Sequence, residues 1–490
     1  MSICAKGWMR ALTLGFLLLV VIIAVASPLA ARAETLNEAL ASAYKVNPRL
    51  DAARASLRAT DEEVPRAISG YRPTVTGNAD TSLQHTATQP SSIANGSSNP
   101  RGYSVQLVQP LFRGFRVVNT VAEAEATVRA GRETLRSVEQ SVLLEAVTAY
   151  MDVVRDQAIV RLRESNVTVL TRDLRATQDR FNVGEVTRTD VAQAQARRAI
   201  AVSALDLAKS NLQTSRATYE RVIGHPPSNL VEPRPSRLVP KTLADSSEIS
   251  ARENPAMVAA LYREQGARHV IDRIRGEGLP SAQLEVGYQR RFDENVRIDS
   301  QETTTVTGRL TVPFYSGGEV EARIRQAKQT HVGRLQEIQQ ARTEVLAQVV
   351  TAWSQLNAAR AQLESDQASV EANRIALAGV REEQRVGQRT LLDVLNAEQE
   401  LLNSEVNLVT TKRNLVVASY NVLSTIGRLN SQELGVTSLV YDPEIHYLEV
   451  RNKWFDVNIT HSDGRRETFD AAPRPGYRHT AIPTHLANTR

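Results

Sequence analysis

The chain has 490 residues, of which 42% are hydrophobic and only 5% aromatic, and its formal net charge at pH 7 is +5. Because acidic and basic residues interleave and nearly cancel, the composition does not favour nucleic-acid binding, despite an isoelectric point near 9.3. Cys4 is the only cysteine. Beyond it the chain can form no disulfide, thiolate metal site or cysteine nucleophile.

The first residues have the pattern of an export signal. Lys6 and Arg10 precede an apolar run, and the small-x-small sequence Ala31-Arg32-Ala33 stands directly before Glu34. The run is shorter than the about 20 apolar residues that a membrane-spanning helix needs. We therefore predict a secretory signal peptide over residues 1–33 and no transmembrane helix in the exported chain.

The rest of the sequence is duplicated. Val147-Thr148-Ala149-Tyr150 returns as Val350-Thr351-Ala352-Trp353, and Asn47-Pro48 returns as Asn254-Pro255. An internal repeat of this length indicates two similar structural units in one chain. We expect a first repeat over residues 34–224, a proline-rich linker at mid-height over 225–245, a second repeat over 246–432, and an irregular C-terminal segment with a disordered end over 433–490.

Each repeat should contain one very long helix. Two stretches without proline have apolar residues at three-four spacing, and at 1.5 Å per residue they predict helices of about 105 Å. Shorter helical stretches, placed end to end, match that length, which predicts a bundle with coiled-coil packing. The long helices are expected at about 114–184 and 317–387, and the shorter ones at Leu36–Ser69, Arg188–Ile223, Ser246–Arg275 and Leu391–Gly427.

Two strand-like segments precede each long helix, with apolar and polar residues in alternation. Each has about the ten residues of a transmembrane β-strand. Four strands are too few for a membrane barrel, because the smallest have about eight, and an open edge in lipid leaves backbone groups unsatisfied. If the strands lie in a membrane, the protein must oligomerise. The strands are expected at about 74–84, 101–109, 281–291 and 304–313, with a charged loop over 293–302.

Two sequence segments at the ends of the predicted long helices carry a family resemblance. They are FNVGEVTRTDV over residues 181–191 and RVGQRTLLDVL over 385–395, and Tyr71-Arg72-Pro73 before the first strand adds to them. On the basis of these segments, residues 35–432 resemble the TolC-like outer-membrane efflux proteins, also called outer-membrane factors. The resemblance implies a mainly α fold with a membrane β-barrel contribution, in which a homotrimer forms a long α-helical tunnel and a shared 12-stranded β-barrel.

The resemblance also implies a function and partners. It implies an exit duct for type I protein secretion or tripartite multidrug efflux, placed in the outer membrane of a Gram-negative bacterium with a large periplasmic portion. Its partners would be outer-membrane lipid, a periplasmic adaptor (membrane fusion protein), and an inner-membrane transporter of ABC or RND type. We expect no enzyme, cofactor or metal site, since no paired-histidine helix, phosphate loop or nucleophile elbow is present.

The reversals after the long helices contain the candidate site residues. Glycine suits the left-handed turn that ends a helix, which explains Gly184 and Gly387. Thr-x-x-acid spacing predicts caps on the returning helices. The glycines and their neighbours Glu185 and Gln388 are expected to dock the adaptor, although they also suit an ordinary exposed turn. The predicted caps pair Thr187 with Asp190 and Thr390 with Asp393.

The resemblance further implies a gate at the tunnel tip, formed by Asp190, Arg389 and Asp393. Three copies of these acids would form a ring that favours cations. Two departures from the family weaken this expectation, because Asn396 stands where some members have a second acid and Gln384 where some have a tyrosine. The alternative is that both acids only cap their helices.

Two other classes of protein remain as alternatives for the whole chain. A periplasmic helical adaptor should have one helical hairpin between compact β domains, whereas this chain has two duplicated long helices. A structural coiled-coil spacer would not need strand pairs with apolar alternation. Both are less consistent with the sequence than an exit duct.

Overall fold

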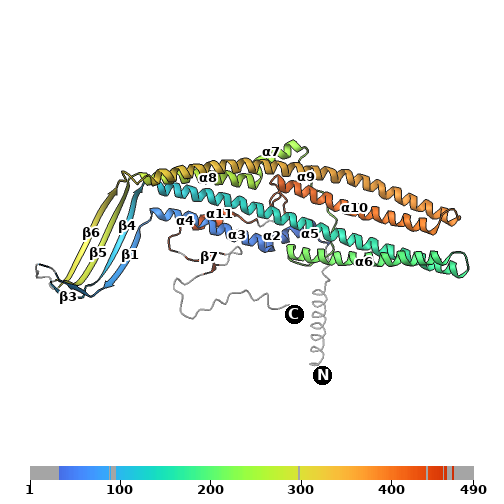
Figure 1. Cartoon of the computed structure of the whole chain (residues 1–490), viewed down its shortest axis with the longest axis horizontal. Helices are drawn as coiled ribbons and strands as arrows, with labels where there is room; N and C mark the ends of the chain where they lie inside the picture. Colours follow the sequence, from blue (N-terminus) through green and yellow to red (C-terminus); the bar gives the residue numbers. More distant parts are fainter. Residues whose placement is uncertain are drawn as a thin grey trace, which may run out of the picture. The chain divides into compact units, whose positions relative to one another are not determined.

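The computed structural model describes residues 33–87, 89, 95–295, 298–436, 440–455, 457–460 and 466–467 (Figure 1). The predicted signal peptide, apart from Ala33, and the expected disordered end of the chain lie outside the described residues. The chain divides into two compact units, and each unit takes segments from both repeats. The first unit comprises Met1–Leu50, Arg136–Val258 and Gln339–Val440, and the second comprises Asp51–Leu135, Ala259–Ile338 and Tyr441–Arg490.

Helices form the first unit. The long helices α5 and α9 span Arg116–Asn182 and Glu319–Arg385, close to the expected ranges, and both begin in the second unit. No helix among the described residues is both long and apolar enough to cross a membrane. The other helices of this unit are α2 (Leu36–Val46), α6 (Arg188–Ile223), α7 (Leu243–Glu253) and α10 (Leu391–Thr425).

A continuous apolar core holds these helices together. It joins side chains of α2, α5, α6, α9 and α10, and it includes Leu40, Leu143, Leu356 and Leu423. Full burial of each such side chain contributes about 1.5–3 kcal/mol relative to exposure. Tyr150 is also fully buried, and its hydroxyl donates to the carbonyl oxygens of two separate chain segments. The core therefore fixes the helices to the linker that follows α6.

Two of the expected shorter helices are broken. The helix expected over Leu36–Ser69 is three helices, α2, α3 (Pro48–Asp61) and α4 (Glu63–Ile68). The helix expected over Ser246–Arg275 is α7 and α8 (Pro255–Arg275). Asn47 and Asn254 end the first piece of each in an extended conformation. The cause is the proline that follows each asparagine, because proline disfavours the α conformation of the residue before it.

The second unit contains a four-stranded antiparallel sheet in the order β1-β4-β5-β6. The pairing of β4 with β5 joins the strands of the two repeats. All eight residues of β1 are exposed, and Val306 on β6 is 69% exposed. No helix or strand in the described part of the chain packs over either face of this sheet to bury it. The strands are β1 (Thr74–Thr81), β4 (Arg101–Arg113), β5 (Ser281–Asn295) and β6 (Ile298–Thr311), and a small hairpin pairs β2 (Gln84–Thr86) with β3 (Gly96–Ser98).

The charged loop expected over residues 293–302 is instead largely strand. β5 continues to Asn295 and β6 begins at Ile298. Arg290 lies directly opposite Glu302 in the register of this hairpin. Opposite charges facing each other across antiparallel strands stabilise their pairing, so charge here marks paired strand rather than loop.

The C-terminal segment is more ordered than expected. It contains helix α11 (Pro443–Val450), because Asp442 caps the helix and Pro443 occupies its first turn. Short strands β7 (Ile459–Thr460) and β8 (Arg466–Glu467) pair beyond it. The helix is held in the second unit by His446, whose Nδ1 lies 2.9 Å from Oδ2 of the fully buried Asp61, and by Glu444, which pairs with Arg132 at 2.9 Å.

Candidate functional site

The two helix reversals of the first unit have the same backbone geometry. Gly184 follows α5 with φ of +81°, and Gly387 follows α9 with φ of +80°. The amide of Glu185 donates to the carbonyl of Arg180 at 2.9 Å, and the amide of Gln388 makes the equivalent bond at 2.9 Å. These are Schellman turns, in which glycine adopts the left-handed conformation at low cost. Glu185 is exposed, which suits a docking surface and an ordinary turn alike, so the docking role stays a prediction.

Both returning helices begin with a complete capping box. The Thr187 hydroxyl accepts from the amide of Asp190, whose carboxylate accepts from the amide of Thr187 at 2.9 Å. Thr390 and Asp393 repeat this arrangement at the start of α10. These hydrogen bonds lower the pKa of both aspartates, because they stabilise the charged carboxylates. The predicted capping is therefore present, and both acids stay charged near neutral pH.

Arg389 makes its closest contact with a residue that the sequence did not single out. Its Nε donates to Oε2 of Glu383 at 2.9 Å, and both side chains are about half exposed. The bond to Glu383 raises the pKa of Arg389, with a smaller contribution from the charge of Asp393. Within one chain the structure thus brings Arg389 near Asp393 but gives it no hydrogen bond to Asp190 or Asp393. The gate stays a prediction.

A second polar link joins the two returning helices close to the reversals. Nη2 of Arg197 on α6 donates to Oδ1 of Asn396 on α10 at 2.6 Å. Beside it, Leu395 packs with Leu170 and Ala201 in a small apolar cluster. The sequence had marked Asn396 only as a departure from the family. The structure shows that its amide connects α6 to α10.

Further from the reversals, ionisable side chains of α5, α9 and α10 lie in the interface where these helices pack. Glu398 is buried, and its Oε1 accepts from Nη2 of Arg381 at 2.5 Å. Oε2 of Glu398 and Oδ2 of Asp173 are buried atoms without a hydrogen-bond partner in the described chain. Burial and the charge of Glu398 raise the pKa of Asp173 to about 6. A signal existed in the sequence, because Glu398 follows Leu395 by three residues and thus interrupts an apolar stripe.

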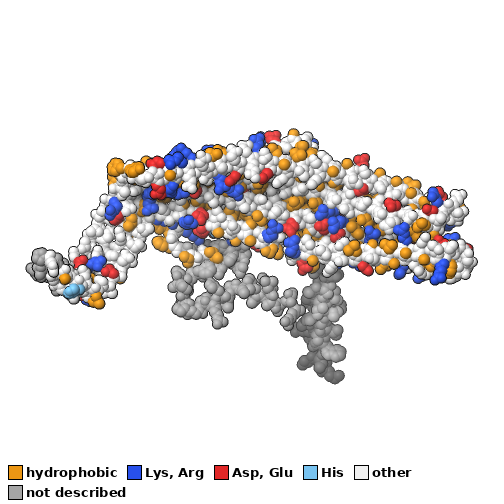
Figure 2. All heavy atoms as spheres, viewed as in Figure 1, with side chains coloured by type: hydrophobic (Ala, Val, Ile, Leu, Met, Phe, Trp, Pro, Cys, Tyr) orange, Lys and Arg blue, Asp and Glu red, His pale blue; other side chains and the backbone are white. Residues whose placement is uncertain are grey.

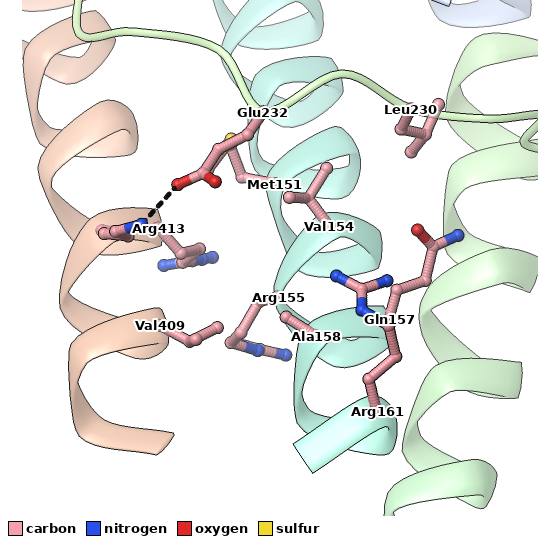
Figure 3. Close-up of a pocket in the computed structure, with 11 residues that line it drawn as sticks. Met151, Val154, Arg155, Gln157, Ala158, Arg161, Leu230, Glu232, Val409 and Arg413 are labelled. Atoms are coloured by element: carbon pink, nitrogen blue, oxygen red, sulfur yellow. Dashed lines mark ion pairs between the residues drawn. The ribbon is translucent and has the colours of Figure 1, made fainter. Parts of the chain in front are cut away.

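A polar pocket lies between α5, α10 and the linker (Figure 3). Its volume of about 130 Å³ is below the about 300 Å³ of even a small ligand pocket. Two of its cations are paired with acids: Lys412 lies 3.2 Å from Glu232 of the linker, and Arg413 lies 2.9 Å from Asp152. The first pair connects the linker to α10 and the second connects α10 to α5. The pocket is too small to hold a transported molecule.

The described residues do not suggest a metal site. No group of three or more His, Cys, Asp or Glu in that part of the chain is placed to hold a metal ion. The eight histidines of the sequence include His446 and His331, which pair with Asp61 and Glu264. Both pairs lie inside the second unit, where they connect neighbouring helices.

Comparison with known proteins connects both repeats to one family. The sequence profile of the outer membrane efflux proteins matches residues 39–225 and 248–428. Over 438 residues the chain is 38% identical to outer membrane efflux protein BepC of Brucella suis, covering 89% of this chain and 94% of that protein. It is 25% identical over 428 residues to outer membrane protein TolC of Escherichia coli, covering 82% and 84%.

A solved structure has the same fold. The outer membrane channel CmeC of Campylobacter jejuni superposes with a TM-score of 0.73 at 19% sequence identity, covering 85% of this chain and 89% of that one. At this identity the likeness concerns the fold alone. It confirms the expected architecture of long paired helices with a short-stranded sheet.

Proposed function

Because the chain belongs to the outer membrane efflux protein family, we propose that it works as a passive exit duct in the outer membrane, assembled from three copies and without enzymatic activity. The location follows from the family and its TolC-like members. The trimer, the passive mechanism and the gate are the parts that need a test. Cargo would be proteins of type I secretion, drugs, or both.

The observation that carries the proposal is the four-stranded sheet. Its outer strands, β1 and β6, each pair on one side only. Valines on both outer strands are exposed, with Val75 at 64% and Val306 at 69%. A sheet with two open edges, and with neither face covered by the described part of the chain, is unstable alone in water, and its edges are not tolerated in lipid. Joining the sheets of further copies edge to edge satisfies the backbone and leaves apolar side chains for lipid.

The helix reversals would serve as gate and docking surface. Arg389 and the acids Asp190 and Asp393 lie within one turn of the reversals and are accessible to a second copy. In the trimer, Arg389 would exchange Glu383 for an acid of a neighbouring copy and so hold the tip closed. An adaptor carrying an inner-membrane transporter of ABC or RND type would bind the turns at Gly184-Glu185 and Gly387-Gln388 and open it.

Single-channel conductance in planar bilayers tests this function. The wild type should show a small, cation-preferring conductance, and Arg389→Ala should raise it several-fold by removing the contact that closes the tip. Arg385→Ala is the matched control, since this exposed arginine belongs to the same helix end and pairs with the equally exposed Glu382. No conductance from correctly inserted protein, in wild type and variant alike, would contradict the duct.

A second experiment separates the two kinds of cargo. Cells lacking the protein should become sensitive to several unrelated drugs if it serves efflux. They should instead retain an unfolded substrate protein inside if it serves type I secretion. Restoration by the wild type, but not by a chain lacking the reversal residues 181–191, would connect either result to adaptor docking.

A further inference from the structure

The C-terminal segment exposes two adjacent large aromatic side chains. Trp454 is 58% exposed and Phe455 is 92% exposed. Their rings lie 6.1 Å apart, so they form one apolar surface. Exposed aromatics of this size, side by side, are costly in water and usually mark a contact surface.

The segment is fixed at the beginning of the sheet. The guanidinium of Arg72 lies 4.7 Å from the centre of the Trp454 ring, and its Nη1 donates to the carbonyl of Lys453 at 2.6 Å. Arg72 stands two residues before the first residue of β1. A cation over an indole ring together with a charge-assisted hydrogen bond sets the orientation of the segment. Trp454 is therefore held where helix gives way to strand.

Other helix–strand junctions of the second unit also expose apolar side chains. Tyr71 borders an apolar cavity of about 160 Å³ at the junctions before β1 and after β4. Phe115 adopts a positive φ of +58°, which is strained for an aromatic residue, and its ring packs edge-on against Phe112 at 5.1 Å. Phe314 after β6 is 95% exposed. Figure 2 shows hydrophobic side chains gathered where helices meet the sheet.

We propose that Trp454 and Phe455 bind the lipid–water interface of the outer membrane on its periplasmic side, with Arg72 as their positioning residue. Tryptophan prefers this interface because its ring is apolar and its N–H reaches polar groups. Arg451, just before the aromatics, is already paired with Glu125 at 3.1 Å, so the aromatic rings themselves would make the contact with lipid. The C-terminal segment would thus anchor the chain at a fixed depth. The inference rests on the proposed seating of the sheet in the membrane.

Tryptophan fluorescence tests the inference, since the chain has only three tryptophans. Full-length protein with Trp8→Phe and Trp353→Phe retains Trp454 alone. In vesicles, we expect lipids brominated near the glycerol end of the acyl chain to remove about half of its emission, whereas aqueous iodide quenches it weakly. Adding Arg72→Ala should release the segment and reverse this pattern. Arg66→Ala is the control, because Arg66 is exposed and pairs with Glu63 on its own helix.

A second reporter distinguishes the inference from the proposed function. It carries Val306→Trp on β6 as the sole tryptophan. If deep brominated lipids quench this residue while iodide alone quenches Trp454, the sheet is in the membrane and the inference is wrong. If bromine quenches neither residue, the proposed seating of the sheet fails as well. Shielding of Trp454 from both quenchers would mean that protein covers it and would also overturn the inference.

Discussion

The side-chain amide of Asn254 donates to the carbonyl of Thr425, with 2.8 Å between Nδ2 and the oxygen. Asn47 makes the equivalent bond to Val222 in the other repeat, at 3.0 Å. In each case the asparagine Oδ1 also accepts from the amide two residues further on, at 3.0 Å for Arg49 and 2.9 Å for Ala256. One amide thus caps the helix that starts at the following proline and satisfies a carbonyl at the end of α6 or α10.

Replacing either asparagine should therefore destabilise the first unit. We expect Asn47→Ala and Asn254→Ala each to lower the free energy of unfolding by about 1–3 kcal/mol, because a carbonyl at a helix end and the start of the next helix lose their partners. Urea unfolding followed by circular dichroism measures the loss. Asn211→Ala on the exposed face of α6 is the matched control and should be neutral. Equal midpoints for all three variants would refute this explanation of the duplicated Asn-Pro.

The two roles considered for the acids at the reversals can be separated with glutamine. A Thr-x-x-Gln sequence still forms a capping box but carries no charge. Asp190→Gln and Asp393→Gln should therefore retain most of the stability of the helix start and reduce the cation preference of the channel. Asp190→Ala should lose both the cap and the charge, and losing the cap should cost about 1 kcal/mol of stability. Unfolding midpoints and reversal potentials in a salt gradient give the two readouts. An unchanged reversal potential in the glutamine variants would leave capping as the sole role.

Much of this architecture could be predicted from the sequence, because long helices and alternating strands leave periodic apolar patterns. The turns at Gly184 and Gly387 and the caps at Thr187 and Thr390 were also predictable, since their geometry depends on adjacent residues. The contact of Arg389 with Glu383, which lies across a single reversal, was not predicted from the sequence. The contact of Asn396 with Arg197 could not be, because it depends on which faces of α6 and α10 join. The order of α11 was missed for a related reason: its stability comes from Asp61, far away in the sequence.

Asn396→Asp tests how the α6–α10 link affects the proposed acid ring. Arg197 lies 2.6 Å from the oxygen of Asn396, so a new carboxylate there would be neutralised by this arginine. We expect Asn396→Asp alone to change the cation preference little and to add at most about 0.5 kcal/mol of stability. With Arg197→Gln also present, the preference for cations should increase. Reversal potentials of the wild type, Asn396→Asp, Arg197→Gln and the double variant form a double-mutant cycle. If Asn396→Asp alone raised the cation preference as much as the double variant does, the proposed neutralisation by Arg197 would be wrong.

Asp173 should make the stability of the first unit depend on pH. Its pKa is about 6 in the folded chain, against 3.8 for an ordinary aspartate, because burial and Glu398 outweigh Arg381 and Arg172. Between these values the folded state holds a proton that the unfolded chain has lost. The stability that this proton gives the folded state is therefore fully present below about pH 4 and is lost as the pH rises through about 6.

Asp173→Asn removes this dependence, because the amide cannot ionise. We expect the variant to be more stable than the wild type at pH 7.5, by about 1 kcal/mol after allowing for screening by solvent, and to match it at about pH 3.5. Thermal unfolding at the two pH values measures the difference. Asp179→Asn, on an exposed face of α5, is the control and should show no such change. If Asp173→Asn were less stable at pH 7.5, the carboxylate would be stabilised by Arg381 rather than destabilised by Glu398. The ionisable cluster would then strengthen the helix interface at neutral pH instead of weakening it.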